Sequence, residues 1–234
     1  MKSDMNSDLD SGMRPSTTLR IGACIAIAAV AALGSSAAVA HPHGWVDLSV
    51  QVVVDDQNRV TALDQTWRMD PFYSLIVFDE LSRVEDATFE QGLDQLGQDI
   101  RDNLSAANYF TEFWADGERQ ALGEVSEYTT LERDGRLIYM FTLPLAEPIP
   151  LADVLLEYQI FDPTYYIEVV HEEQNGAPAE EALVGAPGCA LSITPADPDP
   201  ELVLEAALLD KDETGEPDLG RYFAETGHID CRDG

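Results

Sequence analysis

The sequence predicts an α+β fold that is mostly antiparallel β-sheet and sandwich-like, with one inserted amphipathic helical segment. Two observations predict this class. Short runs of apolar and β-branched residues recur along the chain and are separated by turn residues, a pattern typical of antiparallel strands. A single apolar stripe with helical spacing interrupts them at about residues 89–106. Strands in series with one helical insertion indicate an α+β domain.

The first two strands are predicted to form a hairpin. Residues 45–54 and 60–69 have the composition of strands, and the polar turn Asp55-Asp56-Gln57-Asn58 joins them. Asp70-Pro71 ends the second strand. Ser74 is the predicted cap of a short helix that runs through Leu81.

The inserted helix has the clearest signal. Thr88 and Gln91 have the spacing of a capping box, in which each side chain bonds to the other residue's backbone. Apolar residues then follow at spacings of four, three, four and four, which places them on one face of a helix. They are Phe89, Leu93, Leu96, Ile100 and Leu104.

The second half of the chain is predicted to be mostly strands. They cover residues 109–115, 125–132, 137–143, 154–161, 165–170 and 190–193. Asp134-Gly135 is a two-residue hairpin signal, whereas Pro144, Pro148 and Pro150 break the strand pattern that precedes them. Residues 174–187 are a predicted loop, residues 195–200 a stiff acidic linker, and residues 201–209 a short helix.

Residues 1–40 have the three parts of a cleavable secretory signal. A polar region with basic residues precedes the apolar run Ile21–Leu33, and Ala38-Val39-Ala40 is a small-residue cleavage site. We therefore expect a single exported domain at residues 41–234, without direct membrane insertion after cleavage. The alternative is an uncleaved N-terminal anchor, but an apolar run of 13 residues is short for a membrane-spanning helix.

The chain is strongly acidic, with a formal net charge of −31. Residues 1–40 contain equal numbers of basic and acidic side chains, so the expected mature chain keeps this charge. Such a surface repels nucleic acid and anionic lipid and attracts cations. Adaptation of the surface to salt is the alternative explanation of the same composition.

Two cysteines remain in the expected mature chain, Cys189 and Cys231. An even pair in an exported protein predicts a disulfide. A metal site built from a cysteine and His228, three residues before Cys231, is the functional alternative, and an oxidising compartment disfavours it.

The segment His41-Pro42-His43-Gly44-Trp45-Val46-Asp47 is the strongest candidate for chemistry. Pro42 favours an extended backbone, so that His41 and His43 project to one side, and a strand would place Asp47 there as well. Two imidazoles, a terminal amine and a carboxylate suit a divalent transition metal, namely Zn²⁺, Ni²⁺, Co²⁺ or Cu²⁺. The alternative is two exposed histidines that bind nothing.

Pro42 excludes one copper or nickel geometry. The N-terminal site that uses a third-position histidine also needs the second residue's amide nitrogen, and proline has no amide hydrogen to lose. Chelation by the His41 amine and its own ring remains open, with His43 or a distant histidine completing the site. His171, beside Glu172 and Glu173, is predicted to lie on the surface; it and His228 are the distant candidates.

The sequence predicts a protein that is not an enzyme. It has no nucleophile-elbow, zinc-protease or phosphate-loop motif. One short motif, D-P-x-Y, occurs twice, at Asp70–Tyr73 and at Asp162–Tyr165. The simpler interpretation is that each Asp accepts backbone hydrogen bonds in a turn that Pro fixes. The alternative is that the two loops face each other across a binding site.

Several ordered motifs carry a family resemblance. They are A-H-P-H-G-W-V-D, W-x-M-D-P-F-Y-S, L-P-L-A-E-P, F-D-P-T-Y-Y, G-A-P-G-C and a tail that ends in I-D-C. The chain resembles a family of periplasmic proteins of unknown function, described as the periplasmic component of an uncharacterised ABC-type transport system. Members are commonly encoded beside a permease of the nickel/cobalt type, and some are linked to zinc acquisition.

The resemblance implies a role in transition-metal transport, carried here by His41, His43 and Asp47, with an inner-membrane metal permease as the partner. Two other hypotheses stay open. One is an interaction or structural module that supports the permease without binding metal. The other is a copper-chelating protein that uses its N-terminal histidine.

Overall fold

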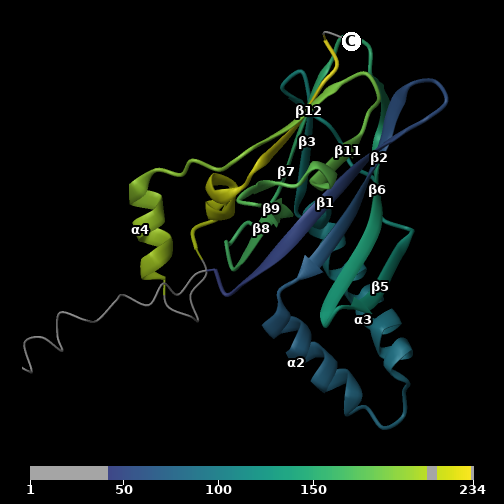
Figure 1. Ribbon diagram of the computed structural model, residues 1–234, viewed down its shortest axis with the longest axis vertical. Helices are drawn as coiled ribbons and strands as arrows, with labels where there is room; N and C mark the ends of the chain where they lie inside the picture. The colour runs from purple at the N-terminus through teal and green to yellow at the C-terminus, as the bar shows by residue number, and fades with distance from the viewer. Residues whose placement is uncertain (1–41, 210–214, 233–234) are drawn as a thin grey trace, which may run out of the picture. The chain divides into compact units, whose positions relative to one another are not determined.

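Two β-sheets form the framework of the computed structural model, which describes residues 42–209 and 215–232 (Figure 1). The larger sheet has the order β11-β1-β2-β6-β5. Its strands are Leu183–Gly185, Gly44–Val54, Arg59–Met69, Arg136–Pro150 and Tyr128–Arg133. β8, Ile167–His171, pairs with the first half of β1, in parallel.

The smaller sheet has the order β12-β13-β7-β3-β4. Its strands are Ala190–Thr194, Thr226–Asp230, Leu155–Ile160, Thr111–Ala115 and Glu118–Arg119. β9, Glu173–Gln174, and β10, Ala177–Pro178, form a separate two-stranded ribbon. Most pairings are antiparallel, so the α+β prediction is confirmed.

The two sheets share one apolar core. Along β1 the buried residues alternate with more exposed ones, and Val46, Leu48, Val50 and Val52 point inward. Phe113, Leu156, Tyr158, Ile160 and Ile229 of the smaller sheet belong to the same cluster. The period of two that separates the faces of a strand therefore gives each sheet one inner face.

Two α-helices lie between β2 and β3, in the two places where the sequence predicts them. They are α2, Pro71–Ser82, and α3, Phe89–Leu104. The capping box of α3 is present, and its predicted apolar stripe packs on the core, with Leu93 buried. A third helix, α4, covers Pro200–Leu208 as the sequence predicts within one residue.

The predicted start of α2 is wrong. The helix begins at Pro71, and Asp70 rather than Ser74 is its N-cap. The Asp70 carboxylate accepts hydrogen bonds from the backbone N–H groups of Phe72 and Tyr73, both at 2.9 Å. Proline suits the first helical position because its missing N–H needs no partner there.

β6 does not end before Pro144 as predicted, but continues to Pro150. Its register with β2 shifts between Val60 and Ala62, so that β6 accommodates extra residues there. The extra residues find other partners: Ala146 N–H donates to the carbonyl of Ala121 at 2.9 Å.

The predicted disulfide is confirmed: Cys189 and Cys231 are joined, with Cα atoms 4.3 Å apart. They flank β12 and β13, which pair along their whole length. The bond therefore fastens the tail of the chain to the edge of the smaller sheet. Among the residues that the structure describes, no helix is long and apolar enough to span a membrane.

Candidate functional site

The start of β1 lies between the two D-P loops. Gly44 pairs with Ile167 of β8 on one side, and Val46 pairs with Met69 of β2 on the other. The backbone N–H of Asp70 donates to the carbonyl of Trp45 at 3.0 Å. Three motifs that are far apart in the sequence, H-P-H-G-W, D-P-F-Y-S and D-P-T-Y-Y, therefore meet at one end of the larger sheet.

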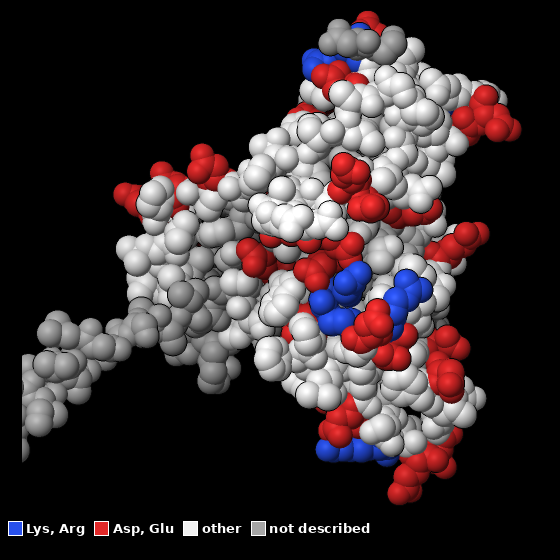
Figure 2. Space-filling view, viewed as in Figure 1, with Lys and Arg blue, Asp and Glu red and all other residues white. Residues whose placement is uncertain are grey.

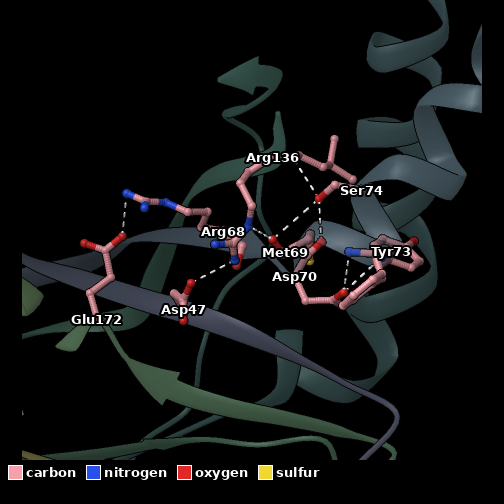
Figure 3. A network of polar contacts seen from close by, with 10 residues as sticks. Asp47, Arg68, Met69, Asp70, Tyr73, Ser74, Arg136 and Glu172 are labelled. Atoms are coloured by element: carbon pink, nitrogen blue, oxygen red, sulfur yellow. Dashed lines mark hydrogen bonds and ion pairs between the residues drawn. The ribbon is translucent and has the colours of Figure 1, made fainter. Parts of the chain in front are cut away.

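The D-P-F-Y-S motif fixes α2 against this end. Ser74 is fully buried, and its hydroxyl accepts a hydrogen bond from the N–H of Leu137 at 3.0 Å and donates to the carbonyl of Asp70 at 2.7 Å (Figure 3). A Cβ atom on Gly44 would lie only 2.7 Å from Oδ2 of Asp70. The glycine of the first motif is therefore required by the aspartate of the second.

Arg136 of β6 forms hydrogen bonds that link three strands next to the candidate site. Its guanidinium donates to Asp47 Oδ2 at 2.8 Å, to the carbonyl of Arg68 at 3.0 Å and to the carbonyl of Met69 (Figure 3). Arg68 in turn pairs with Glu172 at 2.8 Å. The network joins β1, β2 and β6 to the residue that follows β8.

Asp47, a predicted metal ligand, is thus placed against Arg136. It shares the outer face of β1 with Trp45, as the alternation of the strand predicts. Four residues of extended chain span about 13 Å, so the side chains of His43 and Asp47 stand well apart. The structure brings Asp47 to an arginine and not to His43.

The D-P-T-Y-Y loop is built around the buried carboxylate of Asp162. Its Oδ1 accepts hydrogen bonds from the N–H and hydroxyl of Thr164, both at 2.9 Å. Its Oδ2 accepts from the N–H groups of Tyr166 and Ile167, both at 3.1 Å. Asp70 and Asp162 both accept backbone hydrogen bonds, as the turn interpretation predicts, and their loops also flank the same segment.

The two adjacent tyrosines of this loop point in different directions. Tyr165 has φ +56° and is buried, with its ring stacked on Phe223 at 4.0 Å between centroids. Tyr166 is 43% exposed, and its ring stacks on His43 at 4.5 Å with an interplanar angle of 26°. The backbone N–H of His43 also donates to the carbonyl of Tyr166 at 2.9 Å.

The other histidines lie in separate networks. His41 falls outside the described residues. His171 is 2% exposed, so the expectation of a surface histidine is wrong: its Nε2 lies 2.7 Å from the hydroxyl of Tyr158, and its Nδ1 lies 2.8 Å from Glu225. His228 contacts Thr194 and Glu157 across β12, β13 and β7. Within residues 42–209 and 215–232, no three His, Cys, Asp or Glu side chains are grouped to hold a metal.

An open acidic groove with a volume of about 470 Å³ lies along the outer face of β1 and β8. Asp47, Glu168 and Glu172 line it beside Arg68. Burial raises the pKa of the Glu168 carboxyl, a hydrogen bond to Tyr165 opposes this shift, and the nearby Glu225 adds to it. Figure 2 shows acidic side chains in patches scattered over one face of the molecule, with fewer basic ones, some of them near its centre. The groove therefore favours cations.

Sequence reasoning missed an exposed apolar surface on α2. Phe72, Leu75 and Ile76, which we call the α2 face, are 75%, 66% and 59% exposed. The signal was present, because residues 75–78 are all apolar and a helix that is apolar all round has more than one apolar face. The acidic residues Asp79 and Glu80 follow Leu75 and Ile76 at three to five positions in the same helix, and Asp79 pairs with Arg83.

A family model described as a protein of unknown function, DUF1007, matches residues 26–231. The chain belongs to the DUF1007 family. An uncharacterized protein of Haemophilus influenzae is 25% identical over 198 residues, which cover 82% of this chain and 92% of that protein. All motifs of the site described above fall within the part of the chain that the DUF1007 model matches.

Among solved structures, AChBP from Bulinus truncatus matches with a TM-score of 0.26 and 10% identity, over 80% of this chain and 84% of that one. A likeness at this level carries no inference about this chain. DUF1007 is itself a family of unknown function, so the chemistry has to be argued from the residues.

Proposed function

We propose that this DUF1007 protein is a periplasmic accessory protein of a transition-metal transport system. It binds or delivers a divalent metal, zinc, nickel or cobalt, through the mature N-terminal segment His41-Pro42-His43. The observation that carries the proposal is the placement of His43. It is exposed at the very start of β1, between two loops whose buried aspartates accept backbone hydrogen bonds.

The ligand chemistry follows from cleavage after Ala40. Cleavage would give His41 a free amine next to its own imidazole, and His43 would lie two residues away on an extended backbone. These nitrogen donors suit Zn²⁺, Ni²⁺ and Co²⁺, and Cu²⁺ is a further candidate. In this proposal Asp47 stays with Arg136 and adds negative charge to the neighbouring groove. The metal is cargo, and no catalytic role is proposed.

Calorimetry with each of the four metals tests the proposal, on protein that starts at His41. A His41→Ala/His43→Ala double variant should bind at least tenfold more weakly, and a His228→Ala control should bind like the wild type. Affinity should fall as the pH drops through about 6.5, since protons compete for the imidazole nitrogens. Equal binding of every metal by the double variant and the wild type would show that the histidines are not the site.

A second candidate function, favoured by the α2 face, is a non-catalytic interaction module of the inner-membrane permease. The acidic residues that follow it in the helix suit a permease surface that is apolar and rimmed by Lys or Arg, whereas the net charge of −31 disfavours anionic lipid.

The test for this module is co-purification with a co-expressed nickel/cobalt-type permease. A Leu75→Ser/Ile76→Ser variant should lose co-purification and keep metal binding. The matched control is Val203→Ser/Leu204→Ser, which changes exposed apolar residues of α4. Retained co-purification of the α2 variant would rule out this surface.

A further inference from the structure

Tyr166 makes two contacts with His43 that fix different parts of it. The hydrogen bond from the N–H of His43 to the carbonyl of Tyr166, at 2.9 Å, holds the backbone at the start of β1. The ring stack, at 4.5 Å and 26°, holds the orientation of the imidazole. A solvent-exposed histidine beside a chain terminus would otherwise sample several rotamers.

Tyr166 is itself held by a rigid loop. The carboxylate of Asp162 accepts the N–H of Tyr166, and Tyr165 is anchored inward by its stack on Phe223. On the other side of β1, Asp70 lies so close to Gly44 that a Cβ atom there would be 2.7 Å from its Oδ2. The position of the Tyr166 ring is therefore set by buried groups of the fold.

The stack on Tyr166 uses the face of the imidazole ring. Imidazole nitrogens bind metals through lone pairs that lie in the plane of the ring, and Tyr166 covers a face, not the edge. A metal-bound imidazole also gains positive character, which the negative face of an aromatic ring attracts. The contact is thus compatible with coordination and more favourable once metal is bound.

We propose that Tyr166 is a positioning residue for the metal ligand His43, and that it orients the imidazole before the metal arrives. This inference rests on the proposed function of the N-terminal segment. Ordering a side chain in advance removes an entropy cost that binding would otherwise carry, and that cost corresponds to about 2- to 10-fold in affinity per side chain.

The test compares Ni²⁺ and Zn²⁺ affinities of five proteins that start at His41: wild type, Tyr166→Ala, Tyr166→Phe, His43→Ala and Tyr222→Ala. Tyr166→Ala should bind about 2- to 10-fold more weakly, and Tyr166→Phe, which keeps the ring, should match the wild type. Tyr222→Ala, at another exposed tyrosine, is the control and should bind normally. Thermal unfolding checks the fold, and Tyr166→Leu replaces Tyr166→Ala if the latter does not fold.

NMR chemical shifts report on the ring stack itself and distinguish its loss from a general loss of stability. The His43 ring protons should be shifted upfield in the wild type and in Tyr166→Phe, and should return to ordinary positions in Tyr166→Ala. Three results would overturn the role of Tyr166. The His43 ring protons could be unshifted in the wild type, or Tyr166→Ala could bind metal as tightly as the wild type. Tyr166→Phe could also lose as much metal affinity as Tyr166→Ala. Wild-type affinity in His43→Ala would overturn the proposed function itself, so the two failures are distinguishable.

Discussion

Single buried side chains hold the start of β1 in place, and Ser74 is the clearest of them. Its hydroxyl satisfies the N–H of Leu137 in β6 and bonds to the carbonyl of Asp70. Its exposed fraction is 0%, so the hydrogen bond to Leu137 is made away from solvent. The stability of the candidate site therefore depends on a residue that touches none of the proposed ligands.

We expect Ser74→Ala to lower the free energy of unfolding by about 1–3 kcal/mol, because it leaves a buried N–H group without a partner. Ser82→Ala is the matched control in the same helix: its hydroxyl bonds only to the carbonyl of Asp79 and is exposed. The control should change stability by less than about 0.5 kcal/mol. Urea unfolding measures both, and equal effects would contradict the account of Ser74.

The half-buried carboxyl of Glu168 should make stability depend on pH. Because burial raises the pKa of its carboxyl in the folded protein, the folded state holds this proton to a higher pH than the unfolded chain does. The contribution of Glu168 to stability is therefore present at low pH and is lost as the pH rises above about 4.3 and through the folded pKa.

Glu168→Gln, which keeps the shape and removes the charge, should be more stable than the wild type at pH 7. The difference should shrink towards pH 4, where the wild-type carboxyl is protonated in the folded state. Thermal unfolding between these pH values is the measurement. A variant that is less stable at pH 7 would reverse the sign and refute the prediction.

The sequence correctly predicted hydrogen bonds between a side chain and backbone groups a few residues away. The aspartates of both D-P turns accept local backbone hydrogen bonds as predicted. The sequence did not predict contacts between residues that are far apart in the chain. Arg136, which pairs with Asp47, lies 89 positions from it. His171 is buried, and its ring contacts Tyr158 and Glu225. No local pattern contains those partners.

At the scale of elements, α3 packs on β5 through a glycine. A Cβ atom on Gly97 would lie 2.2 Å from the hydroxyl of Thr130 and 3.1 Å from the ring of Tyr128. The helix therefore approaches the strand as closely as it does because position 97 has no side chain.

Gly97→Ala should destabilise the protein by about 1–3 kcal/mol through this overlap, although alanine favours an isolated helix by about 1 kcal/mol. Gly92→Ala in the same helix is the control. There the nearest atom, at 2.9 Å, is the mobile end of the Leu81 side chain, so we expect a neutral or stabilising effect. Denaturant unfolding measures both, and stabilisation by both substitutions would show that the packing is looser than described.

Helices and strands with a regular spacing of apolar residues could be predicted from the sequence. Short strands that form only by pairing with another strand could not. The hairpin of β1 and β2 and the face of α3 followed from periods of two and 3.6 residues. β4, β11 and β13 are short and were missed, since each is a strand only because a neighbour pairs with it. β6 continues through its prolines because β2 accepts a shifted register.

At the scale of the whole molecule, the net charge of −31 implies self-repulsion in the folded state. We expect the midpoint of thermal unfolding at pH 7 to rise when NaCl is raised from about 0.05 M to about 1 M, because salt shortens the screening length. Near pH 4, where many carboxyl groups are protonated, the same increase in salt should have a much smaller effect. A salt response of equal size at both pH values would exclude charge repulsion as its cause.

X-ray absorption at the nickel edge can show whether His41 and His43 coordinate a transition metal. The sample is protein that starts at His41 and carries one equivalent of Ni²⁺, with the His41→Ala/His43→Ala variant as the control. The account predicts a first shell of nitrogen and oxygen donors with the outer-shell scattering of at least two imidazole rings, and loss of that scattering in the variant. An oxygen-only shell, identical in both proteins, would contradict it and assign the bound metal to the acidic surface.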